Sequence, residues 1–108
     1  MSIFDEFIEK ATVEIVSLAE NYWSEYKFAA INDGENFLEQ AKIDLERWTR
    51  ALAKGDLTRE DFEWLVLGKR DLAKLISLKQ AGLSKIALDK FKSELISSIV
   101  STAFKTVV

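Results

Sequence analysis

Three residue types are absent from this chain of 108 residues: cysteine, histidine and proline. Without cysteine, the chain can form no disulfide and offers no thiolate as a nucleophile or metal ligand. Without histidine, it lacks the side chain that most often serves as a general base and as a ligand of transition metals. The dimetal sites of helical bundles use Glu-x-x-His pairs, so this class of enzyme is excluded.

The lack of proline is the most informative absence for the fold. Proline breaks helices, and glycine, which weakens them, occurs only four times. Apolar residues make up 48% and charged residues 31% of the chain, a balance that is typical of folded domains rather than disordered ones. The composition therefore predicts one all-α domain that spans residues 1–108.

Long hydrophobic runs and a strong charge are missing as well. No apolar run approaches the roughly 20 residues that are needed to cross a bilayer. The opening residues, Met1 to Glu6, carry acidic side chains and show no cleavage pattern, so no secretory signal is predicted. We therefore expect a cytoplasmic protein. The net charge of −3 is too small to indicate a partner.

The clearest helix signal lies between Leu57 and Gly82. Thr58 occupies an N-cap position with Asp61 three residues later, so each side chain can bond to a free backbone N–H beside the other. Helical spacing then continues through Phe62, Leu65, Leu72 and Ile76. We predict a helix over 59–81 that ends at the glycine.

An earlier helix is predicted over 3–31. Ser2 and Asp5 repeat the capping-box spacing at its start. One continuous apolar face follows, formed by Phe4, Ile8, Ala11, Ile15, Leu18 and Tyr22. Asn32-Asp33-Gly34 then combines three residues that favour turns, so we expect the chain to turn there.

Another helix is predicted over 35–54, between that turn and Gly55. Its apolar positions alternate by three and four residues: Leu38, Ala41, Leu45, Trp48 and Leu52. Glu46 and Arg50 are four residues apart, in the order that stabilises a helix surface. Glycine is a typical residue at the end of a helix, so Gly55 marks its end.

The last predicted helix begins at Lys85 and runs to near the C-terminus. Ser84 supplies its N-cap, and Gly82 separates it from the helix before. The alternative is an unbroken helix through Gly82, at a cost of about 1 kcal/mol relative to alanine, which would leave three long helices. From Leu95 onward the apolar residues come in pairs: Leu95-Ile96, Ile99-Val100, Ala103-Phe104 and Val107-Val108.

Short links between long helices make neighbouring helices antiparallel. The sequence therefore predicts an antiparallel up-down-up-down four-helix bundle. The acidic residues at the predicted helix starts, which complement the helix dipole, are Glu35, Glu39, Glu60, Asp61 and Glu63. Acid–base chemistry or cation binding by such carboxylates is the alternative interpretation. We predict no enzyme activity, no metal and no cofactor.

Basic residues concentrate in the second half of the chain. Residues 69–108 contain eight lysines and arginines against three acids, whereas residues 1–54 contain six against eleven. An adaptor or regulator that binds nucleic acid through its basic C-terminal half is therefore an alternative function. No aromatic residues alternate with these basic ones, as they do on surfaces that stack on bases, so we rank this function second.

The chain carries more apolar surface than one bundle is expected to bury. Trp64-Leu65-Val66-Leu67 points around most of a helical turn, and only part of that ring can face a single core. Apolar surface with little charge nearby is typical of the centre of a protein interface. The residues that we predict at such an interface are Trp23, Trp64, Val66, Leu67, Ile99 and Phe104.

We therefore predict a non-catalytic helical module for assembly or protein–protein interaction. It is expected to self-associate, as a homodimer or a larger homo-oligomer, through its apolar helix faces. A monomer that covers these residues with its own side chains is one alternative. A membrane-surface helix over 95–108 is another, but its polar face lacks the basic residues that such helices use.

Overall fold

The structure, a computed structural model, describes residues 2–107. All regular secondary structure in this range is helical, as the sequence predicts. The α-helices are α1 (Ile3–Tyr22), α2 (Lys27–Lys54), α3 (Arg59–Leu67), α4 (Ile76–Gln80) and α5 (Lys85–Val107). Two short 3₁₀ helices join them: η1 (Ser24–Tyr26) and η2 (Arg70–Leu72).

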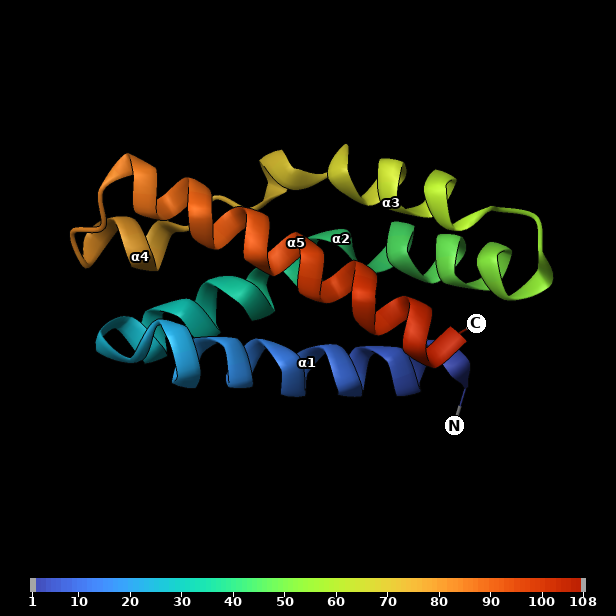
Figure 1. Ribbon diagram of the computed structural model, residues 1–108, viewed down its shortest axis with the longest axis horizontal. Coiled ribbons are helices and arrows are strands. Elements are labelled where there is room, and N and C mark those ends of the chain that lie inside the picture. The colour runs from blue at the N-terminus through green and yellow to red at the C-terminus, as the bar shows by residue number, and fades with distance from the viewer. Residues whose placement is uncertain (1, 108) are drawn as a thin grey trace.

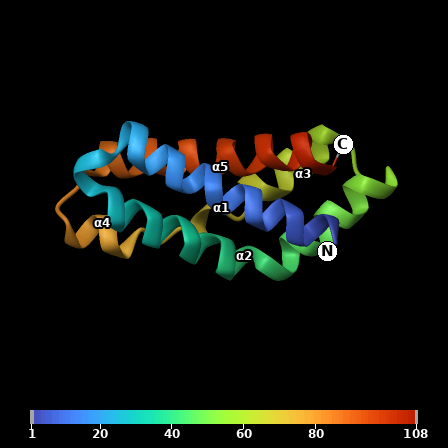
Figure 2. The ribbon, with the colours of Figure 1, turned by 90° about the horizontal axis from the view of Figure 1, so that it is seen from below.

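The chain passes along the length of the molecule four times (Figure 1). The helices α1 and α2 make the first two passes in opposite directions, α3, η2 and α4 share the third, and α5 makes the fourth. Most of the packing is between α1 and its two neighbours, α2 and α5, and Figure 2 shows α1 between them. The chain therefore forms five α-helices in residues 2–107 rather than the four that were predicted, because the third pass is divided.

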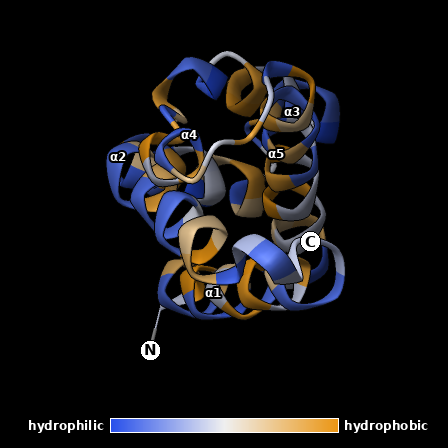
Figure 3. Cartoon of the chain, turned by 90° about the vertical axis from the view of Figure 1, so that its left-hand side faces the viewer, coloured by the Kyte–Doolittle hydropathy of each residue, from blue (hydrophilic) through white to orange (hydrophobic). Residues whose placement is uncertain are grey.

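One hydrophobic core joins all five α-helices. Seen from one end, in Figure 3, every helix carries hydrophobic residues. The helices α1, α2, α3 and α5 each contribute one fully buried phenylalanine: Phe7, Phe37, Phe62 and Phe91. The apolar positions predicted for the second half of α2 are all buried: Leu38, Ala41, Leu45, Trp48 and Leu52. Helical periodicity was therefore a sound guide to burial in this segment.

The helix starts that depend on local capping are confirmed. Ser2 and Asp5 form a capping box at the start of α1, in which the Asp5 N–H donates to Ser2 Oγ at 3.1 Å. Thr58 and Asp61 form the same motif at the start of α3, with a corresponding distance of 3.0 Å. All the groups in these motifs lie within four residues of one another, so sequence spacing is sufficient to predict them.

The predicted glycine stops are also confirmed. Gly55 follows α2 with a left-handed φ of 81°, and Gly82 precedes α5 with a φ of 94°. Glycine adopts this conformation without the strain that a Cβ would cause. Ser84 then caps α5, since its Oγ accepts the N–H of Ala87 at 3.2 Å. The alternative of one helix running unbroken through Gly82 is therefore wrong.

The helix α5 follows the prediction from Lys85 to Val107, and Val108, the last residue of the paired pattern, lies outside the described residues. Most of the paired apolar residues are in the core: Leu95, Ile96, Ile99, Val100 and Ala103. Within residues 2–107 no helix, α5 included, combines the length and apolarity that crossing a bilayer requires.

The turn predicted at 32–34 is wrong, because these residues lie inside α2. The chain turns earlier, at Trp23 and η1. The N–H of Trp23 donates to the carbonyl of Ala19, which closes α1, and the N–H of Tyr26 donates to the carbonyl of Trp23. The predicted helix over 3–31 is therefore two helices, α1 and the start of α2, that meet at this turn.

Gly34 lies inside α2 because α1 and α2 approach each other closely there. A Cβ at this position would lie only 2.6 Å from Cγ2 of Ile15. Ile15 is buried and β-branched, so its methyl group has little freedom to move away. The close packing of the two helices therefore outweighs the low helix propensity of glycine, which is about 1 kcal/mol.

Asp33, the residue before Gly34, lies on the buried side of α2 and binds the start of α4. Its carboxylate accepts the N–H of Ser77 at 3.1 Å and the N–H of Leu78 at 2.8 Å. The Asn32 amide donates to the Ser77 hydroxyl at 2.7 Å. A helix of five residues is not stable by itself, so α4 depends on this cap from another helix.

The helix predicted over 59–81 is wrong between Gly68 and Leu75. Leu75 takes a left-handed conformation, with φ 53° and ψ 41°, which costs roughly 1–2 kcal/mol for a residue with a side chain. Its side chain is buried, and the residues that follow it are bound by Asp33. Burial and these long-range hydrogen bonds offset the strain, and neither is visible in the local sequence pattern.

We predict that Gly34→Ala destabilises the protein, although alanine favours helices. The added methyl group overlaps Ile15 Cγ2, and overpacking of this kind costs about 1–3 kcal/mol. Chemical denaturation measures the change in unfolding free energy. In an Ile15→Ala background, which removes Cγ2, the same change should be neutral or stabilise by up to about 1 kcal/mol. An equal loss in both backgrounds would show that this contact does not limit packing.

Asp33→Ala should lower the unfolding free energy by about 2–3 kcal/mol, because it leaves two backbone N–H groups at the start of α4 without their acceptor. The same denaturation experiment measures this loss, and hydrogen exchange at Ser77 and Leu78 should become faster. Glu39→Ala is the matched control, since Glu39 is an exposed acid of the same helix and should change stability by less than about 0.5 kcal/mol. Equal effects of the two variants would contradict the capping role.

Candidate interaction surface

The six side chains predicted at an interface do not share one surface. Trp64, Val66 and Leu67 belong to α3, whereas Ile99 and Phe104 belong to α5. Trp23 lies in the turn between α1 and η1. Each of them must therefore be judged by its own surroundings.

Val66 and Ile99 are core residues of the single chain. Their side chains are 1% and 0% exposed, so they offer no surface to a second protein. The prediction that they lie at an interface is not compatible with this packing. Val66 is the member of the 64–67 ring that faces the core, one turn after the buried Phe62.

Trp23 is half-buried and already has partners within the chain. Its indole N–H donates to Glu94 Oε1 at 2.7 Å. Its ring meets that of Phe91 edge-on, with 5.5 Å between the centroids. Both the polar and the apolar parts of Trp23 therefore serve to join the turn after α1 to α5.

Phe104 is also half-buried, and α3 covers it. Its ring centroid lies 5.9 Å from that of Phe62 and 5.4 Å from the guanidinium carbon of Arg59. An arginine at this distance from a ring is attracted by the electron-rich face. Phe104 therefore holds the start of α3 against the end of α5 and presents little free surface.

Trp64 is the predicted interface residue that the chain leaves free. It is 77% exposed, on the outer side of α3, and α3 lies along the edge of the molecule opposite α1 (Figure 1). Leu67, one turn later, is half-buried. These two residues line an open hollow of about 350 Å³ together with Gly68, Arg70 and Asp71. A protruding tryptophan beside a hollow is typical of the residues that dominate binding energy at interfaces.

Other large apolar side chains are exposed on several helices: Ile3, Val13, Tyr22, Phe28, Ile43, Ile76 and Ile86. Single exposed apolar residues are ordinary on soluble proteins and need no functional explanation. Trp64 differs from them because it has the largest apolar side chain of the set and a second predicted interface residue, Leu67, beside it in the same hollow.

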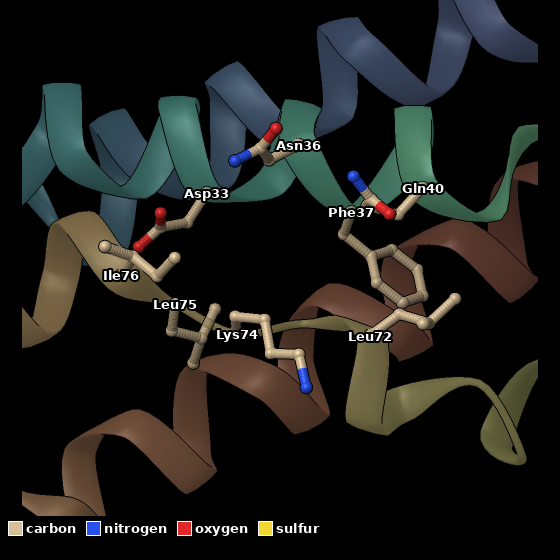
Figure 4. A pocket seen from close by; sticks show the side chains of 8 residues that line it. All are labelled: Asp33, Asn36, Phe37, Gln40, Leu72, Lys74, Leu75 and Ile76. Carbon is tan, nitrogen blue, oxygen red and sulfur yellow. The ribbon is translucent and has the colours of Figure 1, made fainter.

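A second hollow, of about 260 Å³, lies between α2 and the segment that leads into α4 (Figure 4). Its lining residues are Asp33, Asn36, Phe37, Gln40, Leu72, Lys74, Leu75 and Ile76. Figure 4 shows the amides of Asn36 and Gln40 on the α2 side. The Asp33 carboxylate is occupied by the N–H groups of Ser77 and Leu78, so it does not serve as a free base. This hollow therefore lies where Asp33 of α2 binds the start of α4.

The carboxylates that were predicted at helix starts lie on two helices, α2 and α3. Glu35 and Glu39 line a shallow hollow of about 200 Å³ with Lys42, and Asp61 belongs to the capping box. In the described range 2–107, no group of three or more acidic side chains is close enough to hold a metal ion. Helix electrostatics explains the positions of Glu60 and Asp61, which lie in the first turn of α3. The prediction that Glu35 and Glu39 open a helix is wrong, because α2 begins at Lys27 and both residues lie inside it.

Lys69, the first basic residue of the C-terminal half, is paired within the chain. Its Nζ lies 2.8 Å from Asp44 Oδ2, and Asp44 Oδ1 lies 2.8 Å from Arg47. Both cations lie about 6 Å from the ring of Trp48, at 5.9 Å and 6.0 Å. This cluster joins the end of α3 to α2. The charge of Lys69 is therefore paired within the chain and is not free to bind a phosphate of nucleic acid.

The cluster also changes the acidity of Asp44. The hydrogen bond from Lys69 is the largest cause and lowers the pKa of the carboxyl below its usual 3.8. Partial burial opposes the shift, and the charges of Lys69 and Arg47 add to it. Asp44 is therefore more strongly ionised in the folded protein than in the unfolded chain.

Sequence reasoning missed the residues around the exposed tryptophan. Arg70 and Asp71 were placed in a continuous helix, in which Asp71 shares the face of Trp64 but Arg70 does not. The break after α3 brings Arg70 to the rim of the hollow as well. Sequence reasoning also missed that Asp33 is buried. Its spacing could have shown this, because Asp33 lies three residues after Ala30 and four before Phe37, on the apolar side of α2.

Comparison of the chain with protein-family models, with curated proteins and with solved structures gave no match. The function must therefore be inferred from the surface itself. The most distinctive exposed feature is Trp64 with its adjoining hollow.

Lys69→Met should lower the unfolding free energy by at most about 1 kcal/mol at pH 7, because the ion pair is partly exposed. Since pairing lowers the pKa of Asp44, its contribution is complete above the usual carboxyl pKa of 3.8 and is lost as the pH falls through the lowered value. Denaturation at several pH values should show the difference from wild type shrinking below about pH 4.

The control is Lys79→Met, which removes an exposed lysine that forms no ion pair within residues 2–107. It should change stability little at any pH. If Lys69→Met differs from wild type by the same amount at pH 7 and well below the usual carboxyl pKa, the pair with Asp44 is not the cause.

Proposed function

We propose that the protein is a non-catalytic helical interaction module that self-associates through the outer face of α3. The observation that supports this function is Trp64, a tryptophan that is 77% exposed beside Leu67 and an open hollow. A tryptophan buries about 150–250 Å² in a contact, which is worth roughly 4–6 kcal/mol before the costs of association. No other exposed side chain of the described chain offers as much apolar surface.

The expected association is weak and reversible. The helix α3 has nine residues and is therefore about 13 Å long, so its outer face is small. Interfaces below about 1,200 Å² belong to the transient class. Because two proteins also lose translational and rotational freedom on binding, which costs about 4–15 kcal/mol, we expect a dissociation constant in the micromolar range.

We further propose that the module is a distorted antiparallel four-helix bundle, with α3, η2 and α4 together in the third position. Successive passes of the chain run in opposite directions along the molecule, which supports this arrangement (Figure 1). The packing of α1 on α2 and α5, and of α3 on the same two helices, also supports it. In this arrangement α3 is a short outer helix, and one side of it is available to a partner.

Trp64→Ser should abolish self-association, because it removes the largest exposed apolar side chain of α3. Sedimentation velocity over about 5–500 µM should show wild-type protein moving towards twice the monomer mass, with the variant staying monomeric. Circular dichroism should show unchanged helix content, since the side chain is outside the core.

The matched control is Phe28→Ser, which removes an equally exposed aromatic residue, 81% accessible, from the start of α2. It should associate like the wild type. A wild-type protein that remains monomeric at several hundred micromolar would overturn the proposed function, and so would an equal loss of association in both variants.

A further inference from the structure

We propose that the outer face of α3 binds a second copy of itself about a two-fold axis, with each Trp64 placed in the hollow of the other copy. This inference rests on the proposed self-association and specifies its geometry. The face carries a protruding ring and a hollow side by side, and Trp64 itself forms one wall of that hollow. A two-fold contact therefore fills both hollows at once and leaves neither ring exposed.

The hollow suits a flat aromatic ring. Leu67 supplies an apolar wall, and Gly68, which is exposed and has no side chain, allows a ring to approach the backbone closely. The volume is about 350 Å³, and the hollow is open to the outside, so a ring can enter without any rearrangement of the chain. The apolar contact is therefore available in the conformation that the single chain already has.

The charges around the face are complementary to a second copy. Glu60 lies one helical turn before Trp64, on the same side of α3, whereas Arg70 lines the hollow. When Trp64 enters the hollow of a second copy, its neighbour Glu60 approaches the arginine there. Both residues are exposed, and neither forms an ion pair within residues 2–107. The two-fold axis forms this pair twice.

Asp71 supplies the remaining polar contact. An indole N–H that becomes buried needs a hydrogen-bond acceptor, and Asp71 is an exposed carboxylate on the rim of the hollow. A parallel arrangement of the two α3 helices would instead bring Glu60 against Glu60, which is repulsive. The charges therefore favour the antiparallel two-fold contact over the parallel one.

Charge reversal tests this geometry. Arg70→Glu leaves only acids at both ends of the face. Glu60→Arg replaces the partner of Arg70 with a second cation, while Asp71 stays beside Arg70 in both copies. Each variant alone should therefore repel itself, with a dissociation constant about tenfold or more above that of the wild type. An equimolar mixture should associate about as tightly as the wild type, because the mixed dimer keeps one native Glu60–Arg70 pair and forms the second pair with its charges exchanged. Sedimentation velocity measures all four samples, and circular dichroism checks that each variant is folded.

The outcomes separate this inference from the function on which it rests. A monomeric wild type overturns both. If the wild type associates and Trp64→Ser does not, but the charge variants behave like the wild type or their mixture fails to recover, the two-fold geometry is overturned and self-association stands. The milder variants Arg70→Gln and Glu60→Gln decide the matter if a reversal prevents folding, because each should weaken association and lessen its dependence on salt.

Discussion

The hydrogen bonds from the Asp33 carboxylate to the start of α4 are the interaction on which the third pass of the chain depends. They hold a five-residue helix that has no local side-chain cap at its N-terminus, and they support a left-handed Leu75 directly before it. A continuous helix over this pass would keep Asp71 on the side of Trp64 and Leu67 but would turn Arg70 away from it. In the divided pass both Arg70 and Asp71 line the hollow beside Trp64. The break after α3 therefore adds Arg70 to the candidate surface.

Much of the fold was predictable because its determinants are local. Capping boxes, glycine stops and the three-four spacing of apolar residues involve groups a few residues apart, and they correctly indicated the start of α3, the end of α2 and the extent of α5. The failures lie where a contact between distant segments reverses a local preference. Gly34 is helical because Ile15 packs against it, and Asp33 is buried because Ser77 and Leu78 bind it.

For the same reason, the sequence did not separate the exposed members of the predicted interface from the buried ones. A run of four apolar residues shows that some of them must face away from the core, but not which ones. The direction of the core decides this: Phe62 and Val66 are four residues apart and share the buried side, so Trp64 faces outward. Ile99 is buried because it continues the face formed by Leu95 and Ala103. Applying the same spacing to every residue of the run would have separated surface from core.

The position of Asp33 also has a consequence for the order in which the chain folds. The donor and acceptor of its bond to Leu78 are 45 residues apart in the sequence. Five residues cannot nucleate a helix alone, so α4 forms only after α2 exists and the long intervening loop has closed. Helices with their own caps, such as α1 and α3, face no such requirement. Within the third pass, α4 therefore becomes native only after α2 has formed, whereas α3 can form before it.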